Sequence, residues 1–334
     1  MKTVLQVATS FVLFLVCRFA LAAPPCAVDQ QRLSAALDEA ERSTDPASPC
    51  VRIADVIYGR KLGMLLTMDV LKPPRQNGAG VIWVASGGFI SNHGMIAGEG
   101  FVRRMEPFLK RGYTVFAVLH GSMPKYEMRE ITADCHRAVR FIRHHAEDFG
   151  VDPNRIGISG ASAGASLALL IGTKGGPGDP KANDSVDRES SRVQSVACFF
   201  PGTDWLNFLA DGVDCLEITQ RRGLIDGFRF REYDPTLKEH VLITDPKRVE
   251  KILRDHSPVN WAPPESAPAL MIHGEKDVMP PHHSTRMADK LKAEGVPAEA
   301  IIKKGEGHGW SNMEPDMQRL ADWHDRHLRP ERER

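Results

Sequence analysis

The sequence has no excess of charge of either sign, and it contains few aromatic residues. Lysine and arginine together number 43, as do aspartate and glutamate, and aromatic residues make up 7% of the 334 positions. Balanced charge gives no bulk attraction to nucleic acid or to an anionic membrane surface, so neither partner is expected, and bulk charge is not expected to select the substrate. Internal repeats and low-complexity tracts are also absent from the sequence, which excludes a repeat architecture. What remains is the composition of an ordinary globular protein with one large domain or two small ones.

No apolar run in the sequence reaches the roughly 20 residues that a membrane-spanning helix requires. The apolar run near the N-terminus, the candidate for such a helix, starts after Lys2 and is interrupted by Arg18. Small residues, which are typical of the cleavage site of a secretory leader, then precede a proline pair. We therefore expect residues 1–22 to be a signal peptide, cut after Ala22 or Ala23. The mature chain is expected to be secreted or periplasmic, without stable membrane insertion.

Cysteine is scarce and, once the leader is removed, odd in number. One of six cysteines falls in the leader, which leaves five in a chain bound for an oxidising compartment. Cys135 lies at helical spacing from apolar residues and is expected to be a buried thiol. The other four leave two pairings open, Cys26 with Cys50 and Cys198 with Cys215.

Residues 51–330 alternate between short apolar runs and longer segments with helical periodicity. Apolar runs without polar interruptions are typical of strands covered on both faces, so this order predicts a mostly parallel sheet between two layers of helices. The expected strands open with a hairpin and comprise residues 51–59, 63–74, 79–85, 113–120, 155–159, 196–200, 269–273 and 300–304. The expected helices are Phe101–Arg111, Glu127–Phe149, Ser162–Ile171, His283–Ala293 and Pro315–His327.

Two segments fall outside this alternation. Residues 23–50 contain an amphipathic run and are expected to form a helical extension. Residues 202–263 separate two expected strands and are rich in charge, and a connection of this length is rarely a plain loop. We expect an insertion that caps the strand ends and shapes a substrate pocket. A surface excursion unrelated to binding is the alternative.

The segment GISGASAGAS places a serine between small residues where an expected strand gives way to a helix. Ser162 is flanked by Ala161 and Ala163, with Gly160 and Gly164 two positions away, in the spacing G-x-S-x-G. A tight turn from strand to helix lifts such a side chain clear of the backbone, and only small neighbours tolerate the crowding. The start of the helix also favours negative charge there. These features predict a nucleophilic serine.

A serine hydroxyl needs a base to become nucleophilic, and the base needs an orienting acid. His308 stands between two glycines after the last expected strand, whereas most other histidines lie near helix ends or on helical faces. Asp277 follows the strand at 269–273, with Glu275 as the alternative acid. The expected triad is Ser162, Asp277 and His308, in the chain order nucleophile, acid, base.

Donors for a developing oxyanion are expected in the loop after an early central strand. Gly87 and Gly88 follow the strand at 79–85, and glycines let backbone N–H groups approach a ligand. With the N–H of Ala163 they form the expected oxyanion hole; a turn that needs positive φ is the other interpretation of the two glycines. The adjacent His282 and His283 lack further ligands at metal-binding spacing, so no metal or other cofactor is expected.

Together these residues resemble the α/β-hydrolase fold over nearly the whole range from Val51 to His327. The segment DPNRIGISGASAG, residues 152–164, looks like the nucleophile region of that fold, and GEGHGW, residues 305–310, is similar to its histidine loop. The resemblance is to the esterase and lipase branches, including secreted bacterial relatives of acetyl-xylan and feruloyl esterases. It implies a cofactor-free serine carboxylesterase that acts on a small-molecule or carbohydrate ester.

The oxyanion loop departs from the pattern of this family. It reads Ala85-Ser86-Gly87-Gly88 where the family often has a histidine and three glycines, so which two N–H groups serve is left open. Four aromatic residues near strand ends or in the insertion are candidates either for the pocket lining or for plain core: Phe199, Phe200, Trp205 and Trp310.

Two other functions share this layout. A prolyl-oligopeptidase-like peptidase has a similar catalytic domain, but the chain has no room for a propeller. A non-catalytic binding protein on the same fold would usually have lost one triad residue, and here all three are present. The sequence therefore favours ester hydrolysis through an acyl-enzyme on Ser162.

Overall fold

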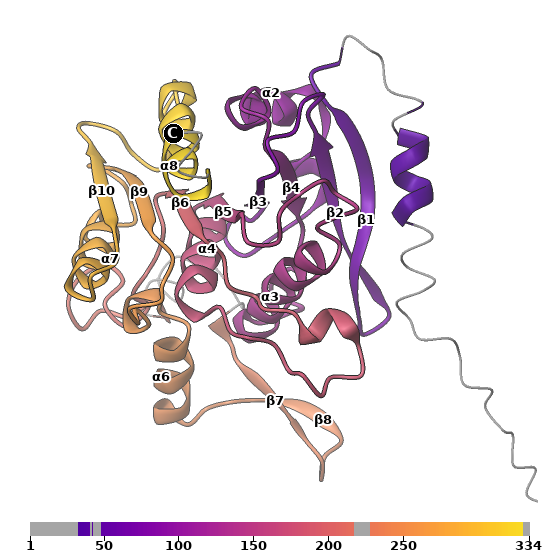
Figure 1. Cartoon of the computed structure of the whole chain (residues 1–334). Coiled ribbons are helices and arrows are strands. Elements are labelled where there is room, and N and C mark those ends of the chain that lie inside the picture. Colours follow the sequence, from indigo (N-terminus) through magenta and orange to yellow (C-terminus); the bar gives the residue numbers. More distant parts are fainter. Residues whose placement is uncertain (1–32, 41, 43–47, 217–227, 330–334) are drawn as a thin grey trace, which may run out of the picture.

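The computed structural model describes residues 33–40, 42, 48–216 and 228–329 (Figure 1). Its main sheet has eight strands in the order β1-β2-β4-β3-β5-β6-β9-β10. The first two strands form an antiparallel hairpin, β2 is antiparallel to β4, and the remaining neighbours are parallel. The strands of this sheet are β1 (Val51–Lys61), β2 (Met64–Lys72), β3 (Gly80–Val84), β4 (Thr114–Val118), β5 (Ile156–Ala161), β6 (Ser195–Phe199), β9 (Ala269–Gly274) and β10 (Ala298–Lys303).

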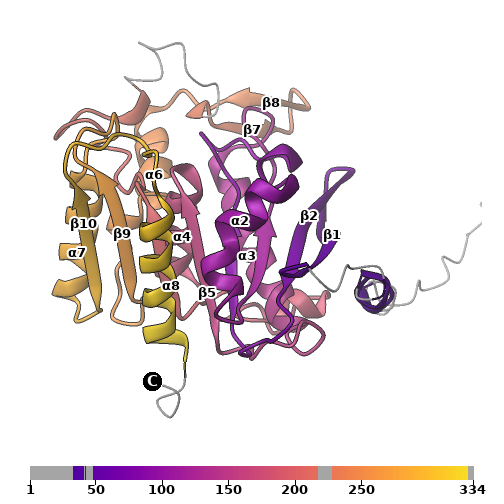
Figure 2. The same cartoon turned by 90° about the horizontal axis from the view of Figure 1, so that it is seen from above.

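Helices cover both faces of this sheet, as Figure 2 shows. One face packs against α2 (Gly98–Leu109) and α8 (Glu314–Leu328), and the other against α3 (Met128–His144), α4 (Ala163–Lys174) and α7 (His282–Ala293). The central strands are buried along their whole length, because apolar side chains leave both of their faces toward a helix layer. The predicted mostly parallel sheet between two helix layers is therefore confirmed.

The segment 202–263 contains structure of its own, which includes β7 (Arg231–Asp234), β8 (Glu239–Leu242), α6 (Pro246–Asp255) and the short 3-10 helix η4 (Pro258–Asn260). The β7–β8 hairpin is anchored where α3 begins, because the N–H of Arg231 donates to Glu127 at 3.1 Å and its carbonyl accepts from Arg129 at 2.9 Å. Helices that follow parallel strands start at the carboxyl edge of the sheet. The hairpin accordingly lies beyond that edge (Figure 2).

Two adjacent histidines at the start of α7 fasten this segment to the main domain. Nδ1 of His283 accepts hydrogen bonds from the N–H of Thr203 at 3.1 Å, and its Nε2 donates to the carbonyl of Phe208 at 2.8 Å. Burial lowers the pKa of His283 to about 3, so the ring stays neutral. His282 contacts the carbonyl of Asn207 at 3.1 Å. Both rings therefore bind backbone of the insertion.

The residues before β1 are described in part. Residues 33–40 and 42 are helical, and Leu33 and Leu37 are buried against the main core. The expected leader, residues 1–22, and Cys26 lie outside the described residues. Within the described ranges, no helix has the length and apolar character needed to cross a membrane.

The described cysteines are buried free thiols. The prediction for Cys135 is confirmed. The proposed pairing of Cys198 with Cys215 is wrong, because Cys198 lies within β6 of the central sheet, whereas the backbone of Cys215 is bonded to Trp205 in the insertion. Cys50 is also a free thiol, and its proposed partner Cys26 lies outside the described residues.

Candidate active site

Ser162 occupies a sharp turn between β5 and α4. Its φ of 56° and ψ of −123° lie in a region that residues with a Cβ rarely adopt. A Cβ at Gly160 would lie 2.5 Å from the carbonyl carbon of Gly164, and a Cβ at Gly164 would overlap the carbonyl oxygen of Val84. The two glycines of the G-x-S-x-G spacing are thus required by the close approach of three backbone segments. Because α4 starts at Ala163, the positive end of its dipole points at the serine.

His308 lies in the loop after β10 and connects the serine to Asp277. Its Nε2 is 2.9 Å from Oγ of Ser162, and its Nδ1 is 2.9 Å from each carboxylate oxygen of Asp277. A carboxylate only accepts hydrogen bonds, so Nδ1 carries the proton and Nε2 is free to accept the proton of the hydroxyl. The structure thus brings together three side chains that are 115 and 31 positions apart in the sequence, in the loops after β5, β9 and β10.

The side chain of Asp277 has no exposed surface, and three donors surround its carboxylate. Burial alone would raise the pKa of Asp277, but hydrogen bonds from His273, from His308 and from the N–H of Met279 outweigh burial and hold that pKa well below its usual value. The carboxylate therefore stays ionised. Glu275, the alternative acid, instead accepts from the N–H of Gly305 at 2.8 Å and takes no part in the chain of hydrogen bonds to Ser162.

The sequence analysis missed His273, a fully buried histidine in β9. Its Nε2 lies 2.8 Å from the carbonyl of Met279 and 3.3 Å from Oδ2 of Asp277, and its Nδ1 lies 2.8 Å from Oγ of Ser284. A carbonyl and a carboxylate both accept, so Nε2 carries the proton and Nδ1 accepts from the Ser284 hydroxyl. Spacing gave no signal for this contact, because His273 lies inside an apolar strand run.

In the loop after β3, one of the expected oxyanion donors, the N–H of Gly87, is already used. The N–H of Gly87 donates to the carbonyl of Ile90 at 3.0 Å, and Ile90 returns a bond of the same length, so the Gly87 N–H is used inside the loop. Gly88 has a φ of 55°, which fits the turn interpretation of this glycine. In the described part of the chain, no recorded hydrogen bond uses the N–H of Gly88 or Ala163. These two groups are the remaining candidates.

The four aromatic candidates divide into two groups. Phe199, Phe200 and Trp310 line a cleft of about 640 Å³, and the ring of Phe200 lies 4.5 Å from that of His308, centre to centre. Trp205 is buried inside the insertion, where its ring packs 5.7 Å from that of Phe89 in the oxyanion loop. Three of the four therefore line a cavity beside the base, and the fourth is core.

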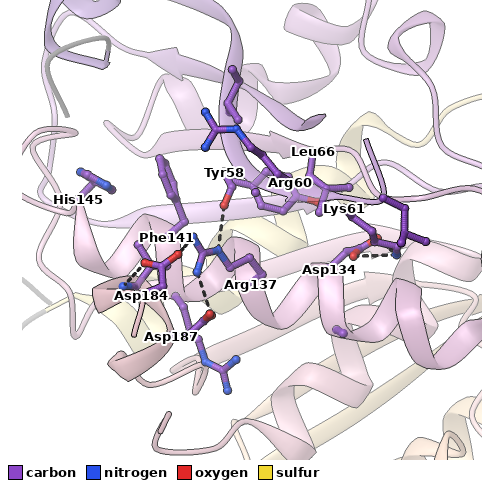
Figure 3. A pocket seen from close by; sticks show the side chains of 16 residues that line it. Tyr58, Arg60, Lys61, Leu66, Asp134, Arg137, Phe141, His145, Asp184 and Asp187 are labelled. Atoms are coloured by element: carbon purple, nitrogen blue, oxygen red, sulfur yellow. Dashed lines mark hydrogen bonds and ion pairs between the residues drawn. The ribbon is translucent and has the colours of Figure 1, made fainter. Parts of the chain in front are cut away.

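A larger cavity, of about 770 Å³, lies between β1 and α3 and is shown in Figure 3. Several of its charged side chains pair with one another: Lys61 contacts Asp134 at 2.8 Å, and Arg137 contacts Asp184 at 2.7 Å and Asp187 at 2.9 Å. None of the loops that carry the three aligned residues contributes to its lining. Its size therefore does not make it the candidate active site. Across the described ranges, no group of three or more metal-ligating side chains was found.

The sequence of this chain matches a known protein family. The sequence profile of the BD-FAE family matches residues 68–291, which is more than half of the chain. The chain belongs to the BD-FAE family. The expected α/β-hydrolase fold is thereby confirmed for this BD-FAE protein.

Solved structures of similar proteins match most of this BD-FAE chain. A truncated form of a carbohydrate esterase from gut microbiota has a TM-score of 0.66 at 21% identity, covering 84% of this chain and 99% of that chain. An acetyl ester-xyloside bifunctional hydrolase from Caldicellulosiruptor lactoaceticus has a TM-score of 0.57 at 25% identity, covering 85% and 88%.

Curated relatives are longer than this BD-FAE protein. Esterase LipC from Mycobacterium tuberculosis (strain ATCC 25618 / H37Rv) is 23% identical over 263 residues, which is 78% of this chain and 60% of LipC. Esterase LipQ from the same organism is 24% identical over 182 residues, which is 54% of this chain and 38% of LipQ. The chain thus spans between about two fifths and three fifths of the relatives it matches.

Proposed function

We propose that this BD-FAE protein is a serine carboxylesterase that cleaves carboxylic esters through an acyl-enzyme on Ser162. The observation that carries the proposal is the continuous chain of hydrogen bonds from Asp277 through His308 to Ser162. In the first step His308 takes the proton of the hydroxyl while Oγ attacks the ester carbonyl, and the carbonyl electron pair moves onto oxygen. The N–H groups of Gly88 and Ala163 are assigned to hold that oxyanion.

Collapse of the tetrahedral intermediate then requires a proton on the leaving oxygen. The imidazolium of His308 gives it to the leaving oxygen, the alcohol departs, and the acyl group stays on Ser162. Water repeats the attack with His308 as base and releases the acid. Asp277, ionised and buried, stabilises the imidazolium in both halves of the reaction. We assign His273 the role of a positioning residue, because it is a third donor to the carboxylate, besides His308 and the N–H of Met279.

The proposed substrate is a small-molecule or carbohydrate ester. Support comes from the names of similar proteins, which include esterases, a carbohydrate esterase and an acetyl ester-xyloside hydrolase. We assign residues 202–263 as a cap over the site, because the rings of Trp205 and Phe228 pack on Phe89 in the oxyanion loop at 5.7 and 6.0 Å. Export through the N-terminal leader is part of the proposal, and a mature chain that begins at Ala23 or Pro24 by mass spectrometry would support it.

A panel of p-nitrophenyl acyl esters tests this function against the peptidase alternative. We expect hydrolysis of short-chain esters and no cleavage of aminoacyl-proline amides, with turnover lost in Ser162→Ala. Preference for the amides would identify a peptidase. No turnover of either class by a folded protein, judged by far-UV circular dichroism, would indicate a non-catalytic binding protein.

A further inference from the structure

The cleft of about 640 Å³ lies next to the candidate triad. It lies between α2 and the N-terminal half of α8, and Ala161, the residue before Ser162, is part of its wall. Figure 2 shows α2 and α8 on the same face of the sheet, where the two helices are in contact. The cleft therefore borders the turn that carries Ser162, although Ser162, Asp277 and His308 are not among its lining residues.

The wall of this cleft is aromatic and held in place by buried groups. The rings of Phe200 and Trp310 lie 6.0 Å apart, and Phe200 also lies 4.5 Å from the ring of His308. The indole N–H of Trp310 donates to Asp316 at 2.9 Å, and this fully buried carboxylate also pairs with Lys303 at 2.9 Å. A planar ring could thus pack against surfaces that already have a fixed orientation.

The position of the base decides which part of an ester enters the cleft. His308 must return its proton to the leaving oxygen, so the alcohol part has to depart on the side of the imidazole. The cleft opens on that side, because Phe200 contacts the His308 ring and Trp310 follows it by two residues. The alcohol part of the ester is therefore the part that the cleft would hold.

Two guanidinium groups stand at the rim of the cleft. Arg103 and Arg104 are neighbours on α2, both line the cleft, and both are exposed. Neither forms an ion pair or hydrogen bond recorded among the described residues. The two acidic residues of the lining, Glu106 and Glu314, both interact electrostatically with Lys110, which donates a hydrogen bond to Glu106 at 2.6 Å.

The lining of the cleft carries two cationic and two anionic side chains, which are Arg103, Arg104, Glu106 and Glu314. Among the described residues neither arginine forms an ion pair, whereas Glu106 is bonded to Lys110. Guanidinium groups present several N–H donors in a planar fork that matches a carboxylate. The cleft thus combines aromatic faces for a ring with two donors for an anion.

We propose that the cleft between α2 and α8 selects esters whose alcohol part is a ring bearing a carboxylate, which Arg103 and Arg104 bind. This inference rests on the proposed serine esterase function and names a substrate class for the same site. Balanced net charge over the whole chain leaves such selection to this local pair of cations.

Two acetate esters of nearly the same size test the inference. 4-Acetoxybenzoate carries a carboxylate on its leaving ring, and 4-acetoxybenzamide carries a neutral amide there. The value of kcat/KM for each is divided by its rate of hydrolysis in hydroxide, which removes the difference in leaving-group reactivity. We expect the corrected value to be about tenfold higher for the benzoate, which corresponds to about 1.4 kcal/mol. Raising the salt from 20 to 500 mM should shrink this ratio, because exposed charges are screened.

A double variant and a matched control assign the preference to the two arginines. In Arg103→Ala/Arg104→Ala the benzoate-to-benzamide ratio should fall to about one. Arg254→Ala removes an exposed arginine from α6, outside the cleft, and should keep the wild-type ratio. A benzoate-to-benzamide ratio near one in the wild type, or a wild-type ratio in the double variant, overturns the inference. Turnover of the benzamide ester would in that case still support the esterase proposal. Failure to hydrolyse either ester would contradict the esterase proposal itself.

Discussion

Replacing His273 by phenylalanine tests whether a buried neighbour positions the acid of the triad. Phenylalanine keeps a ring in the strand, but it removes the N–H that lies 3.3 Å from Asp277 and 2.8 Å from the carbonyl of Met279. It also leaves the hydroxyl of Ser284 without its acceptor. The carboxylate then keeps two of its three donors, those of His308 and Met279.

The size of the effect follows from these contacts. A hydrogen bond to a charged group contributes roughly 1.5–3 kcal/mol, and the 3.3 Å length places this one at the lower end. If that stabilisation acts on the imidazolium in the transition state, kcat falls by about tenfold. KM should change little, because His273 contacts Asp277 and not the substrate. Two buried polar groups without partners should lower the free energy of unfolding by roughly 2–6 kcal/mol.

The assay separates catalysis from stability. kcat and KM for p-nitrophenyl acetate are measured at a temperature at which far-UV circular dichroism shows the variants folded. His273→Gln keeps an N–H donor and should recover most of the lost kcat. His324→Phe is the matched control, because His324 is another fully buried histidine, bonded to Ser159 at 2.9 Å, and among the described residues it forms no hydrogen bond to Ser162, Asp277 or His308. It should lose stability and keep kcat.

Full kcat in folded His273→Phe would refute the positioning role. An equal loss of kcat in His324→Phe would also refute it, because the effect would then follow from lost stability alone.

Two further predictions concern the turn at Ser162 and the response to acid. Gly164→Ala should lower kcat at least a hundredfold or prevent folding, because the new Cβ would overlap the backbone carbonyl of Val84; normal activity would show that the turn is not so tightly packed. Acid should destabilise the chain below pH 6.5, because burial lowers the pKa of four folded-state histidines to about 4 (His120 and His136) or about 3 (His283 and His324). As the pH falls, histidines bind protons in the unfolded chain at a higher pH than in the folded chain. Each of the four should therefore lower the free energy of unfolding by up to about 1.4 kcal/mol per pH unit from about pH 6 to 4. Equal urea midpoints at pH 7 and 5 would contradict this.

The sheet could be predicted because its strands are apolar on both faces. An unbroken run such as residues 79–85 has few alternatives to a buried strand, and the segments of helical periodicity between such runs supply the crossovers of a parallel sheet. The hairpin and the helix within residues 202–263 were not predicted. Their side chains are largely charged, and most of β7 and β8 is exposed, so no apolar period marks them.

The alignment of Ser162, Asp277 and His308 could be predicted because each residue follows a parallel strand, and the carboxyl ends of these strands lie at one edge. The oxyanion loop could be predicted only in part. Whether the N–H of Gly87 faces a ligand or the carbonyl of Ile90 depends on backbone angles that a pair of glycines leaves free. His273 was missed because its role depends on the fold of the loop after β9, which brings Asp277 back beside it.

Reaction with a fluorophosphonate probe, followed by peptide mass spectrometry, tests the central claim most directly. Attack on phosphorus needs a serine hydroxyl with a base aligned on it, which is the arrangement of the half-buried Ser162 and His308 at 2.9 Å. We predict one modified peptide, with the label on Ser162, strongly reduced labelling in His308→Ala, and none at that position in Ser162→Ala. An unlabelled wild-type protein, or a label on a different residue, would contradict the account.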